Sequence, residues 1–480
     1  MAYQVPHNIE HNKVFLVNFS ELDGRLEPEY YRPSLYSLEK KIRSLSSKKL
    51  CDYAISIAGG ATPAKTEYDK YYSDSKSGIP FLRVQNLQTN GELSLDDCVY
   101  INEETHNGLL QRSQVAEGDL LVKITGVGRM AVASVAPKNF VGNTNQHMVV
   151  IKTGDASISK YLARFLNLDI VEKIASRHST GGTRPALDYP SLKAVPIIEG
   201  IDFSPIDRAI CLQKEKEHEA QQLLESIDSY LLEELNITLP KYKTDLGSRF
   251  FIVNKSILDK RWDPYYSQVY FRDAFKAVES GRYPVANLKS ISELITSGIT
   301  PKSGGEAYTE DRNNGVPFIR SGNISIDGEL NYDDLLYLKP KIHETVMSSS
   351  KLKMNDLLIA IVGATIGQVG IYLSNEEANI NQAIALVRLK EGYNIQFVKE
   401  LIKSSIGQLS LNRLKRPVAR ANINLEEIGT IKIVLPPLDK QNEIASHIFE
   451  VRQKAKALQE EGKAILEEAK RIVESMIIGK

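Results

Sequence analysis

The chain has 480 residues, 42% of them hydrophobic and 25% charged, so it is too long for one ordinary core and suits two to four globular domains. Sixty basic residues balance sixty acidic ones, and a net charge of zero is a mild argument against a protein that grips nucleic acid alone. No stretch approaches the roughly 18 apolar residues of a membrane span, and the N-terminus lacks a signal-peptide core, so we expect a cytoplasmic protein without membrane contact.

Charge is segregated along the chain. Residues 399–420 carry a net charge of +5, and residues 203–237 carry a net charge of −5. A basic patch can therefore coexist with overall neutrality. The three cysteines lack CxxC spacing and the eight histidines show no ligand spacing, so we expect neither a disulfide nor a metal site.

One pattern occurs twice along the chain. Residues 78–83 (GIPFLR) recur as residues 315–320 (GVPFIR), a shift of 237, and an asparagine follows each run, Asn86 or Asn323. Further matches follow in the same order: GEL at 91–93 and 328–330, DLL at 119–121 and 356–358, and NQ at 145–146 and 381–382. This series identifies a tandem repeat whose copies begin near residues 20 and 255.

Within each copy, short β-rich runs alternate with turns rich in Gly and Asn. In chain order we expect strands over 81–84, 120–124 and 148–151 and a helix over 158–176, then strands over 318–319, 357–361 and 383–389 and a helix over 395–411. The predicted fold class is α+β, with two similar α/β domains in tandem, each built around a twisted sheet and followed by a long helix.

Each copy ends in a long charged segment with helical periodicity. Apolar residues recur every seven positions in two parallel rows, which predicts a coiled-coil seam. The seam residues are Ile206, Ile210, Leu224, Ile227 and Leu231 in the first segment and Ile444, Ile448, Val451, Leu458, Ile465 and Ile472 in the second. We predict an antiparallel coiled coil, a rod on the order of 50 Å long. The alternative is that each helix folds onto its own domain.

These signals divide the chain into six parts. They are an N-terminal segment (1–19), a first domain (20–200), a first long helix (201–238), a linker (239–260), a second domain (261–435) and a second long helix (436–480).

The order of these motifs resembles the DNA specificity subunit of type I restriction-modification systems. The resemblance rests on the repeated Gly-x-Thr-Pro (60–63 and 298–301), the Gly-hydrophobic-Pro-Phe strand, the Asp-Leu-Leu step, the Asn-Gln pair and Leu-Pro-Pro-Leu at 435–438. It extends from about residue 20 to the C-terminus, although the first copy departs from the pattern at 195–200.

The resemblance implies two target-recognition domains, each of which reads half of a split sequence in double-stranded DNA. It implies that the helix pair fixes the distance between the halves, and that two methyltransferase subunits and restriction (translocase) subunits are partners. No cofactor is then expected in this chain, because S-adenosylmethionine would be bound by the methyltransferase. Arg, Lys, Asn and Gln, which read base edges and hold phosphates, would make the contacts.

Candidate DNA contacts cluster in four segments. A basic run before the last strand of the second copy fits phosphate contact, the alternative being a solvated surface turn. The other three segments are the glycine-rich counterpart of this run in the first copy and one turn after a strand in each copy. The candidate residues are Lys123, Thr125, Arg129, Arg177, Thr183, Arg184, Thr365, Gln368, Arg413, Lys415, Arg416, Arg420 and Asn422.

Three enzyme motifs are incomplete. Residues 59–66 resemble a phosphate-binding loop, but the second copy keeps only Gly-x-Thr-Pro. Residues 263–266 (DPYY) lack the second proline of an adenine methyltransferase motif, and the glycines near 126 and 363 form no dinucleotide fingerprint. We therefore predict a non-catalytic chain. The rival hypotheses are a stand-alone DNA-modifying enzyme and a protein-interaction scaffold that does not touch DNA.

Overall fold

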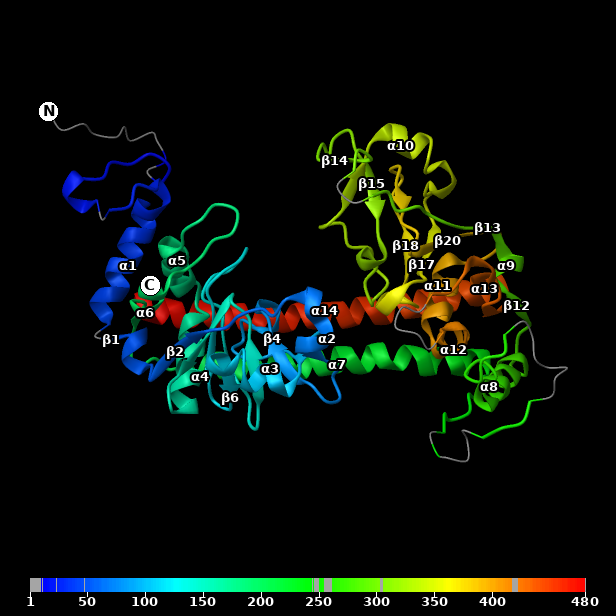
Figure 1. Cartoon of the computed structure of the whole chain (residues 1–480), viewed down its shortest axis with the longest axis horizontal. Coiled ribbons are helices and arrows are strands. Elements are labelled where there is room, and N and C mark those ends of the chain that lie inside the picture. The colour runs from blue at the N-terminus through cyan, green and yellow to red at the C-terminus, as the bar shows by residue number, and fades with distance from the viewer. Residues whose placement is uncertain are drawn as a thin grey trace. The chain divides into compact units, whose positions relative to one another are not determined.

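The computed structural model describes residues 10, 12–22, 24–46, 48–243, 245, 250–253, 261–302, 305–416 and 422–479, and of Lys65 the main chain only. It forms two compact units (Figure 1). Unit 1 comprises Met1–His218 and Leu458–Lys480, and unit 2 comprises Glu219–Ala457. In the described part of the chain, no helix has both the length and the apolar character needed to cross a bilayer.

Unit 1 contains three sheets. Their strands are ordered β2-β10-β7-β8, β3-β5-β4-β9-β6 and β1-β11. The strands are β1 (Lys48–Lys49), β2 (Ser56–Gly59), β3 (Tyr72–Ser73), β4 (Ile79–Leu82), β5 (Val99–Ile101), β6 (Gln114–Ala116), β7 (Leu120–Lys123), β8 (Ala133–Val135), β9 (Val141–Thr144), β10 (Met148–Lys152) and β11 (Pro196–Ile197). The helices are α1 (Pro33–Leu45), α2 (Tyr68–Tyr71), α3 (Glu103–Asn107), α4 (Ala156–Leu166), α5 (Asp169–His178), α6 (Tyr189–Lys193) and α7 (Ser204–Leu235).

Unit 2 repeats this plan. Its sheets are ordered β13-β20-β17-β18, β14-β16-β15-β19 and β12-β21. The strands are β12 (Val285–Asn287), β13 (Ser292–Ser297), β14 (Tyr308–Thr309), β15 (Val316–Ile319), β16 (Leu336–Leu338), β17 (Asp356–Ala360), β18 (Val369–Tyr372), β19 (Asn379–Ile380), β20 (Ile384–Leu389) and β21 (Lys432–Val434). The helices are α8 (Val269–Glu279), α9 (Leu288–Ile291), α10 (Pro340–Glu344), α11 (Ile395–Lys403), α12 (Ser405–Leu414), α13 (Leu425–Gly429) and α14 (Leu438–Ile478).

The duplication extends to strand register. In unit 1 the parallel pair β4 and β9 aligns Phe81 with Asn143, and in unit 2 the parallel pair β15 and β19 aligns Phe318 with Asn379. These partners are related by shifts of 237 and 236, the values seen in the sequence. The predicted α+β class and the tandem arrangement are therefore confirmed.

The helix predicted after the later strands is broken in both units. Residues 158–176 form α4 and α5, because the Asn167 side chain pairs with β8: it accepts from Ala133 N (3.1 Å) and donates to Ala133 O (2.7 Å). Residues 395–411 form α11 and α12, separated at Ser404, whose hydroxyl donates to the Leu401 carbonyl (2.7 Å). A side chain that bonds the main chain locally competes with helix continuation.

In each unit, segments of α7 and α14 run antiparallel. In unit 1, Lys216 pairs with Glu461 (3.1 Å), and a Cβ added at Gly462 would lie 3.3 Å from Gln213. In unit 2, the Tyr230 ring lies 4.1 Å from the His447 ring, and Glu234 pairs with Lys440 (2.7 Å). In both units, residues further along α7 contact residues earlier in α14, as antiparallel helices require.

The helix segments also enter the domain cores. Ile206 and Ile210 share the unit 1 core with Leu466, Ala469 and Val473, and Ile227 and Leu231 share the unit 2 core with Ile444 and Ile448. The predicted helix pairing and its alternative, folding onto a domain, therefore occur together. Leu458 is buried, and Leu224, Val451 and Ile465 are partly buried.

One predicted seam residue is wrong. The Ile472 side chain is 43% exposed, and its neighbour Val473 is fully buried instead. An α-helix has about 3.6 residues per turn, so a strict seven-residue pattern drifts by about 20° per heptad around a straight helix. By the last turns of α14, that drift has moved the buried face by one residue.

Candidate nucleic-acid interface

Several loops meet at one end of the sheet β2-β10-β7-β8 in unit 1 and of the sheet β13-β20-β17-β18 in unit 2. In unit 1, β2 and β7 end there and β8 and β10 begin there. We call the segments at this end, residues 60–64, 124–132, 145–147 and 180–187, loop cluster 1. The equivalent segments of unit 2, residues 298–301, 361–368, 381–383, 415–416 and 422–424, form loop cluster 2.

Main-chain hydrogen bonds join the loops in the same way in both clusters. In each, the first residue after β7 or β17 is bonded through both its main-chain N–H and its carbonyl oxygen. The bonds are Ile124 N to His147 O (3.0 Å), Leu187 N to Ile124 O (2.8 Å), Ile361 N to Ala383 O (2.9 Å) and Ile423 N to Ile361 O (3.0 Å). Segments predicted separately from the sequence are thus brought together: the turn after β7 meets residues 180–187, and the turn after β17 meets residues 422–423.

The repeated Gly-x-Thr-Pro motif has a packing cause. A Cβ on Gly60 would lie 1.9 Å from the Thr144 carbonyl oxygen, and one on Gly298 would lie 1.6 Å from the Ile380 carbonyl oxygen. Only glycine permits this approach of two main chains. It places Thr62 against Gln146, to which its hydroxyl donates, and it places Thr300 Oγ1 3.4 Å from Gln382 N.

Two of the predicted contacts brace loop cluster 1 from within. Lys123 is buried, its Nζ donates to Val127 O (2.7 Å), and burial lowers its pKa. Arg129 pairs with Asp169 and donates to Asn167 O (2.6 Å). The two cations hold the turn in place, so their role at an interface is to position it.

Other predicted residues of loop cluster 1 lie at the surface. Thr183 and Arg184 are exposed, in a loop anchored by the bridge between Thr125 and Ala186. Arg184 lies close enough to His147 that its charge, after burial, lowers the His147 pKa. Thr125 forms this bridge to Ala186 through its main chain and lies at the base of the loop that contains Thr183 and Arg184.

Two exposed polar side chains beside these loops were missed. Gln146 belongs to the repeated Asn-Gln pair and contacts Thr62, while Arg112 donates from Nε to Gly59 O (3.2 Å). Gln146 carried a signal, because its motif is duplicated. Arg112 carried none: its counterpart at the shift of 237 is Ser349, and only the fold brings it to Gly59.

Arg177 is better explained as a structural residue than as a DNA contact. It is buried, its guanidinium pairs with Glu39 and it donates to Tyr30 O (2.6 Å). In unit 2, Arg413 donates to Tyr266 O (3.0 Å) and lies 3.9 Å from the centre of that ring. Both arginines anchor the N-terminal segment of their domain, which explains why they are duplicated.

The basic run of loop cluster 2 is partly neutralised. Arg416 pairs with Glu427 (2.9 Å) and donates to Asn422 O (2.8 Å). Lys415 donates to Asn412 Oδ1 (2.9 Å), and burial lowers its pKa. Asn422 is exposed. Arg420 lies outside the described residues.

The turn after β17 differs from its counterpart in unit 1. Thr365 donates to Val362 O (3.3 Å), and the Gln368 side-chain oxygen is buried without a hydrogen-bond partner. The structure thus places Gln368 at the base of the turn with one acceptor unused. Because this oxygen is buried, Gln368 could contact DNA only if a hydrogen-bond donor entered loop cluster 2.

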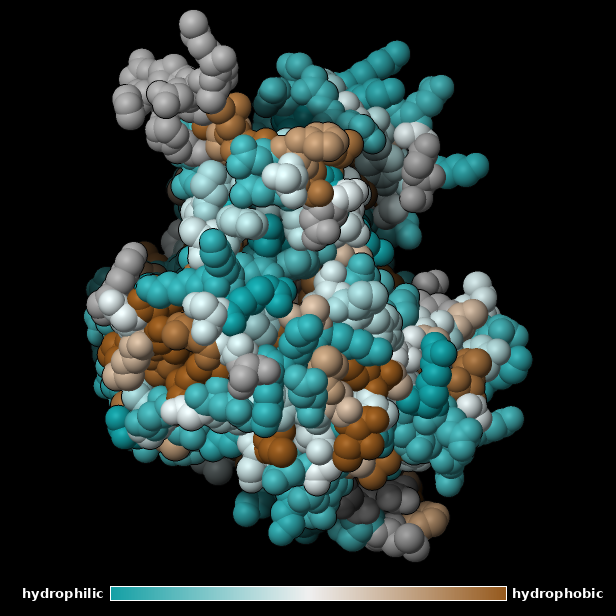
Figure 2. All heavy atoms as spheres, turned by 90° about the vertical axis from the view of Figure 1, so that its left-hand side faces the viewer, coloured by the Kyte–Doolittle hydropathy of each residue, from teal (hydrophilic) through white to brown (hydrophobic). Residues whose placement is uncertain are grey.

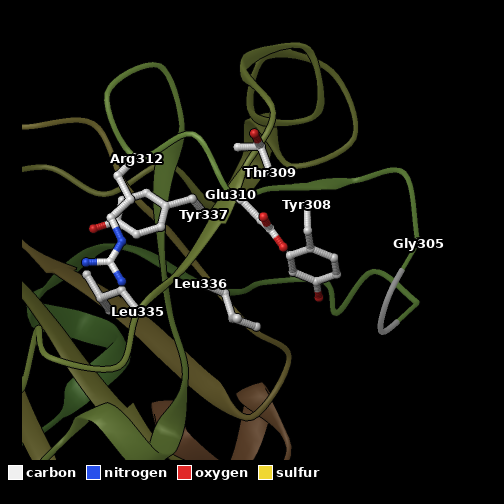
Figure 3. A pocket seen from close by; sticks show the side chains of 8 residues that line it. All are labelled: Gly305, Tyr308, Thr309, Glu310, Arg312, Leu335, Leu336 and Tyr337. Atoms are coloured by element: carbon white, nitrogen blue, oxygen red, sulfur yellow. The ribbon is translucent and has the colours of Figure 1, made fainter. Parts of the chain in front are cut away.

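Two surface hollows are lined by residues outside the loop clusters, although Tyr308, which lines one of them, donates to Pro301 O of loop cluster 2 (3.1 Å). One of about 600 Å³ opens on β14 and β16, and Figure 3 shows Arg312 beside the Tyr337 ring with Tyr308 and Glu310 on the other side of Leu336. The Tyr308 and Tyr337 rings are half-buried, and aromatic rings next to a cation are groups on which nucleic-acid bases stack. These residues were not predicted from the sequence.

The second hollow, of about 650 Å³, is lined by residues of α1, α5 and the end of α14, with both acidic and basic side chains. Figure 2 looks at the side on which α1 lies and shows separate hydrophobic patches between hydrophilic ones. Such mixing is ordinary for a protein surface.

Comparison with known proteins identifies the second half of the chain. Residues 283–468 match the family model described as type I restriction modification DNA specificity domain. This region is a type I DNA specificity domain. The specificity domain begins just before β12, contains the described part of loop cluster 2 and includes most of α14. The family resemblance predicted from the sequence is confirmed.

A curated protein similar to this chain is the putative type I restriction enzyme MjaX specificity subunit of Methanocaldococcus jannaschii. It is 27% identical over 190 residues, which are 37% of this chain and 42% of that protein. The match thus spans less than half of the relative's length.

Two solved structures are similar to this chain over most of its length. An HsdS subunit from Thermoanaerobacter tengcongensis is 14% identical, with 90% of this chain and 95% of that chain covered and a TM-score of 0.32. The S subunit of a type I restriction-modification system from M. genitalium is 14% identical, with 90% and 94% covered and a TM-score of 0.33.

Proposed function

We propose that this chain is the non-catalytic DNA specificity subunit of a type I restriction-modification complex. The observation that carries the proposal is the family match over 283–468, which contains the described loops of loop cluster 2. Loops at one end of a rigid sheet can present polar groups to base edges, while basic groups fix the register on the phosphates.

Unit 1 is proposed to be a second reading domain. It has the same sheet order as unit 2 apart from the additional edge strand β6, the same loop connections and the same Arg–Tyr anchor, but different exposed residues, such as Arg184 and Arg112. A shared frame with divergent loops suits a protein that reads two different half-sites. Half-sites on one face of B-DNA repeat about every 34 Å.

The long helices are proposed to set the spacer and to bind the partners. These partners would be two methyltransferase subunits, which would hold S-adenosylmethionine, and restriction subunits. Together they would act on double-stranded DNA in the cytoplasm. Catalysis would then belong to the partners, and this chain would contribute only the choice of sequence.

Methylation mapping of the reconstituted complex tests the proposal. The full chain is co-expressed with its neighbouring methyltransferase, and methylated sites are sequenced for the wild type, for a Gln146→Ala/Arg184→Ala double variant and for a Gln382→Ala/Asn422→Ala double variant. We expect a bipartite site in which the first double variant relaxes one half and the second relaxes the other half.

The rivals give different results. A stand-alone enzyme would methylate or cut DNA when the purified chain is tested without partners. A scaffold that does not bind DNA would leave the methylated sequence unchanged in both double variants. Either result would overturn the proposal.

A further inference from the structure

A buried histidine in unit 2 faces two carboxylates. The His343 side chain is 1% exposed, and its Nε2 is buried without a hydrogen-bond partner. Nε2 lies 3.4 Å from Glu377 Oε2 and 3.6 Å from Glu344 Oε1, and the three ligand atoms lie within 4.8 Å of one another. The histidine comes from the body of α10, Glu344 from its last residue, and Glu377 from the loop before β19.

The surrounding hydrogen bonds determine which ring nitrogen carries the proton. Asn379 Nδ2 donates to Met347 O (2.9 Å) and Ser350 Oγ (3.2 Å), which orients the amide so that Oδ1 faces His343 Nδ1. Because an amide oxygen only accepts, Nδ1 must be the donor. In the neutral ring, Nε2 then has a free lone pair directed toward the carboxylates.

This is the arrangement of a metal-binding histidine, whose second nitrogen is bonded to a carbonyl-type oxygen. Ligand atoms of a tetrahedral zinc ion, each about 2.0–2.2 Å from it, are about 3.3–3.6 Å apart. The two separations from Nε2 match this spacing. The third separation is the one between the two carboxylate oxygens. It can shorten to the same spacing, because the Glu344 and Glu377 side chains are 59% and 71% exposed and can rotate.

Lys351 leaves the site available. Its Nζ donates to Glu344 Oε2 (2.6 Å), while the other oxygen of the same carboxylate, Oε1, faces His343. Glu344 therefore has one oxygen for the lysine and one for a ligand at Nε2.

Unit 1 provides an internal comparison. His106 Nδ1 contacts Asn143 Oδ1 in the same way, so the His–Asn pair is part of the repeated fold. The positions of the two carboxylates are occupied there by Asn107 and Val141. The fold thus forms the pair without acidic residues, and the carboxylates are an addition to unit 2.

From this geometry we propose that His343, Glu344 and Glu377 bind a divalent transition-metal ion of the Zn²⁺ type. One imidazole and two carboxylates suit such an ion better than Ca²⁺ or Mg²⁺, which prefer oxygen ligands alone. The ion links α10 to the start of β19 and so stabilises the β14-β16-β15-β19 sheet. Histidine spacing in the sequence could not indicate this site, because Glu377 is far along the chain.

The test is zinc titration of the full chain after chelator treatment, followed by calorimetry. We expect one Zn²⁺ equivalent that Glu377→Gln weakens at least tenfold, since even outer-shell changes weaken metal sites by about 10–100-fold. Glu376→Gln is the matched control: it removes the same charge from the neighbouring exposed residue and should leave binding unchanged. Zinc should raise the Tm of the wild type and of Glu376→Gln, but not of Glu377→Gln.

Two outcomes overturn the proposal. One is that no zinc equivalent distinguishes the wild type from Glu377→Gln, which would leave His343 as an ion-pair partner of the carboxylates. The other is equal uptake of Ca²⁺ by both proteins with no preference for Zn²⁺, which would indicate an acidic surface without the histidine. Glu344→Gln gives an independent second variant, because its side chain is also exposed.

Discussion

The guanidinium carbon of Arg413 lies 3.9 Å from the centre of the Tyr266 ring, and Arg177 lies 4.1 Å from the Tyr30 ring. Each arginine also donates to the carbonyl of the tyrosine it covers. The two pairs are related by the shift of 236 and tie the N-terminal segment of each domain to a late helix. What differs is the third group: Glu39 beside Arg177, and at the equivalent position Phe275, whose ring is 5.3 Å from Arg413.

This difference predicts unequal costs for the same substitution. Arg177→Met should destabilise the protein by about 3–5 kcal/mol, because it removes a charged hydrogen bond to the buried Glu39 carboxylate in addition to the cation–π contact and the hydrogen bond to Tyr30 O; Glu39 keeps Arg43 and His178 as partners. Arg413→Met should cost about 1–2 kcal/mol, since it removes a cation–π contact and a hydrogen bond. Urea unfolding of the wild type and the two variants shows which substitution lowers the free energy of unfolding more. A loss of DNA binding with unchanged stability in Arg177→Met would contradict the structural role.

Glu39 predicts a pH dependence of stability. Burial raises the Glu39 pKa, but hydrogen bonds and charge from His178, together with Arg43 and Arg177, outweigh burial and hold it at about 2, below the usual 4.5. A carboxyl whose pKa is lower in the folded state stabilises the protein above its unfolded pKa and loses that effect as the pH falls through the folded value.

The stability difference between wild type and Glu39→Gln should therefore be largest above about pH 4.5 and shrink toward pH 2. Urea midpoints measured at several pH values test this. Glu29→Gln, which removes an exposed carboxylate paired with Arg32, is the charge-matched control. A Glu39→Gln difference that does not change with pH would show that its carboxyl does not titrate in this range.

Arg184 predicts a salt-dependent loss of DNA affinity. It is exposed in loop cluster 1, so Arg184→Ala should weaken binding to random duplexes and lower the slope of log K against log salt by about one. Arg32→Ala removes a partly exposed charge next to α1, outside the loop clusters, and serves as the control. Equal salt slopes for wild type and Arg184→Ala, measured by filter binding, would exclude phosphate contact by this residue.

The long helices predict a change in spacer length. Because segments of α7 and α14 pack antiparallel in both units, residues 216–222 and 454–460 should be deleted together. The pair then shortens by about 10 Å, which corresponds to about three base pairs. Methylation mapping should show both half-sites unchanged and the spacer shorter. A deletion in α14 alone should instead put the seam out of register, and an unaltered spacer in the double deletion would reject the ruler hypothesis.

The sequence alone determined the duplication, six of the sheet strands and the two long helices. These features depend on local pattern: a repeat at a constant shift, β-rich runs between Gly and Asn turns, and apolar rows along a helix. It also singled out the segments that meet in the loop clusters, since unusual polar and glycine-rich stretches are visible without coordinates. Where a local pattern was extrapolated, it failed, as at Ile472, because seven residues of a straight α-helix fall about 20° short of two full turns.

Tertiary structure decided what each charged residue does. Arg177, Arg129 and Arg184 look alike in the sequence, yet one is buried against Glu39, one braces a loop through Asp169, and one is exposed. The same holds for His343, which meets Glu377 only because β19 passes beside α10. Charge and hydrogen-bonding capacity are properties of the residue, whereas burial and partners are properties of the fold, and the free energy of a contact depends on both.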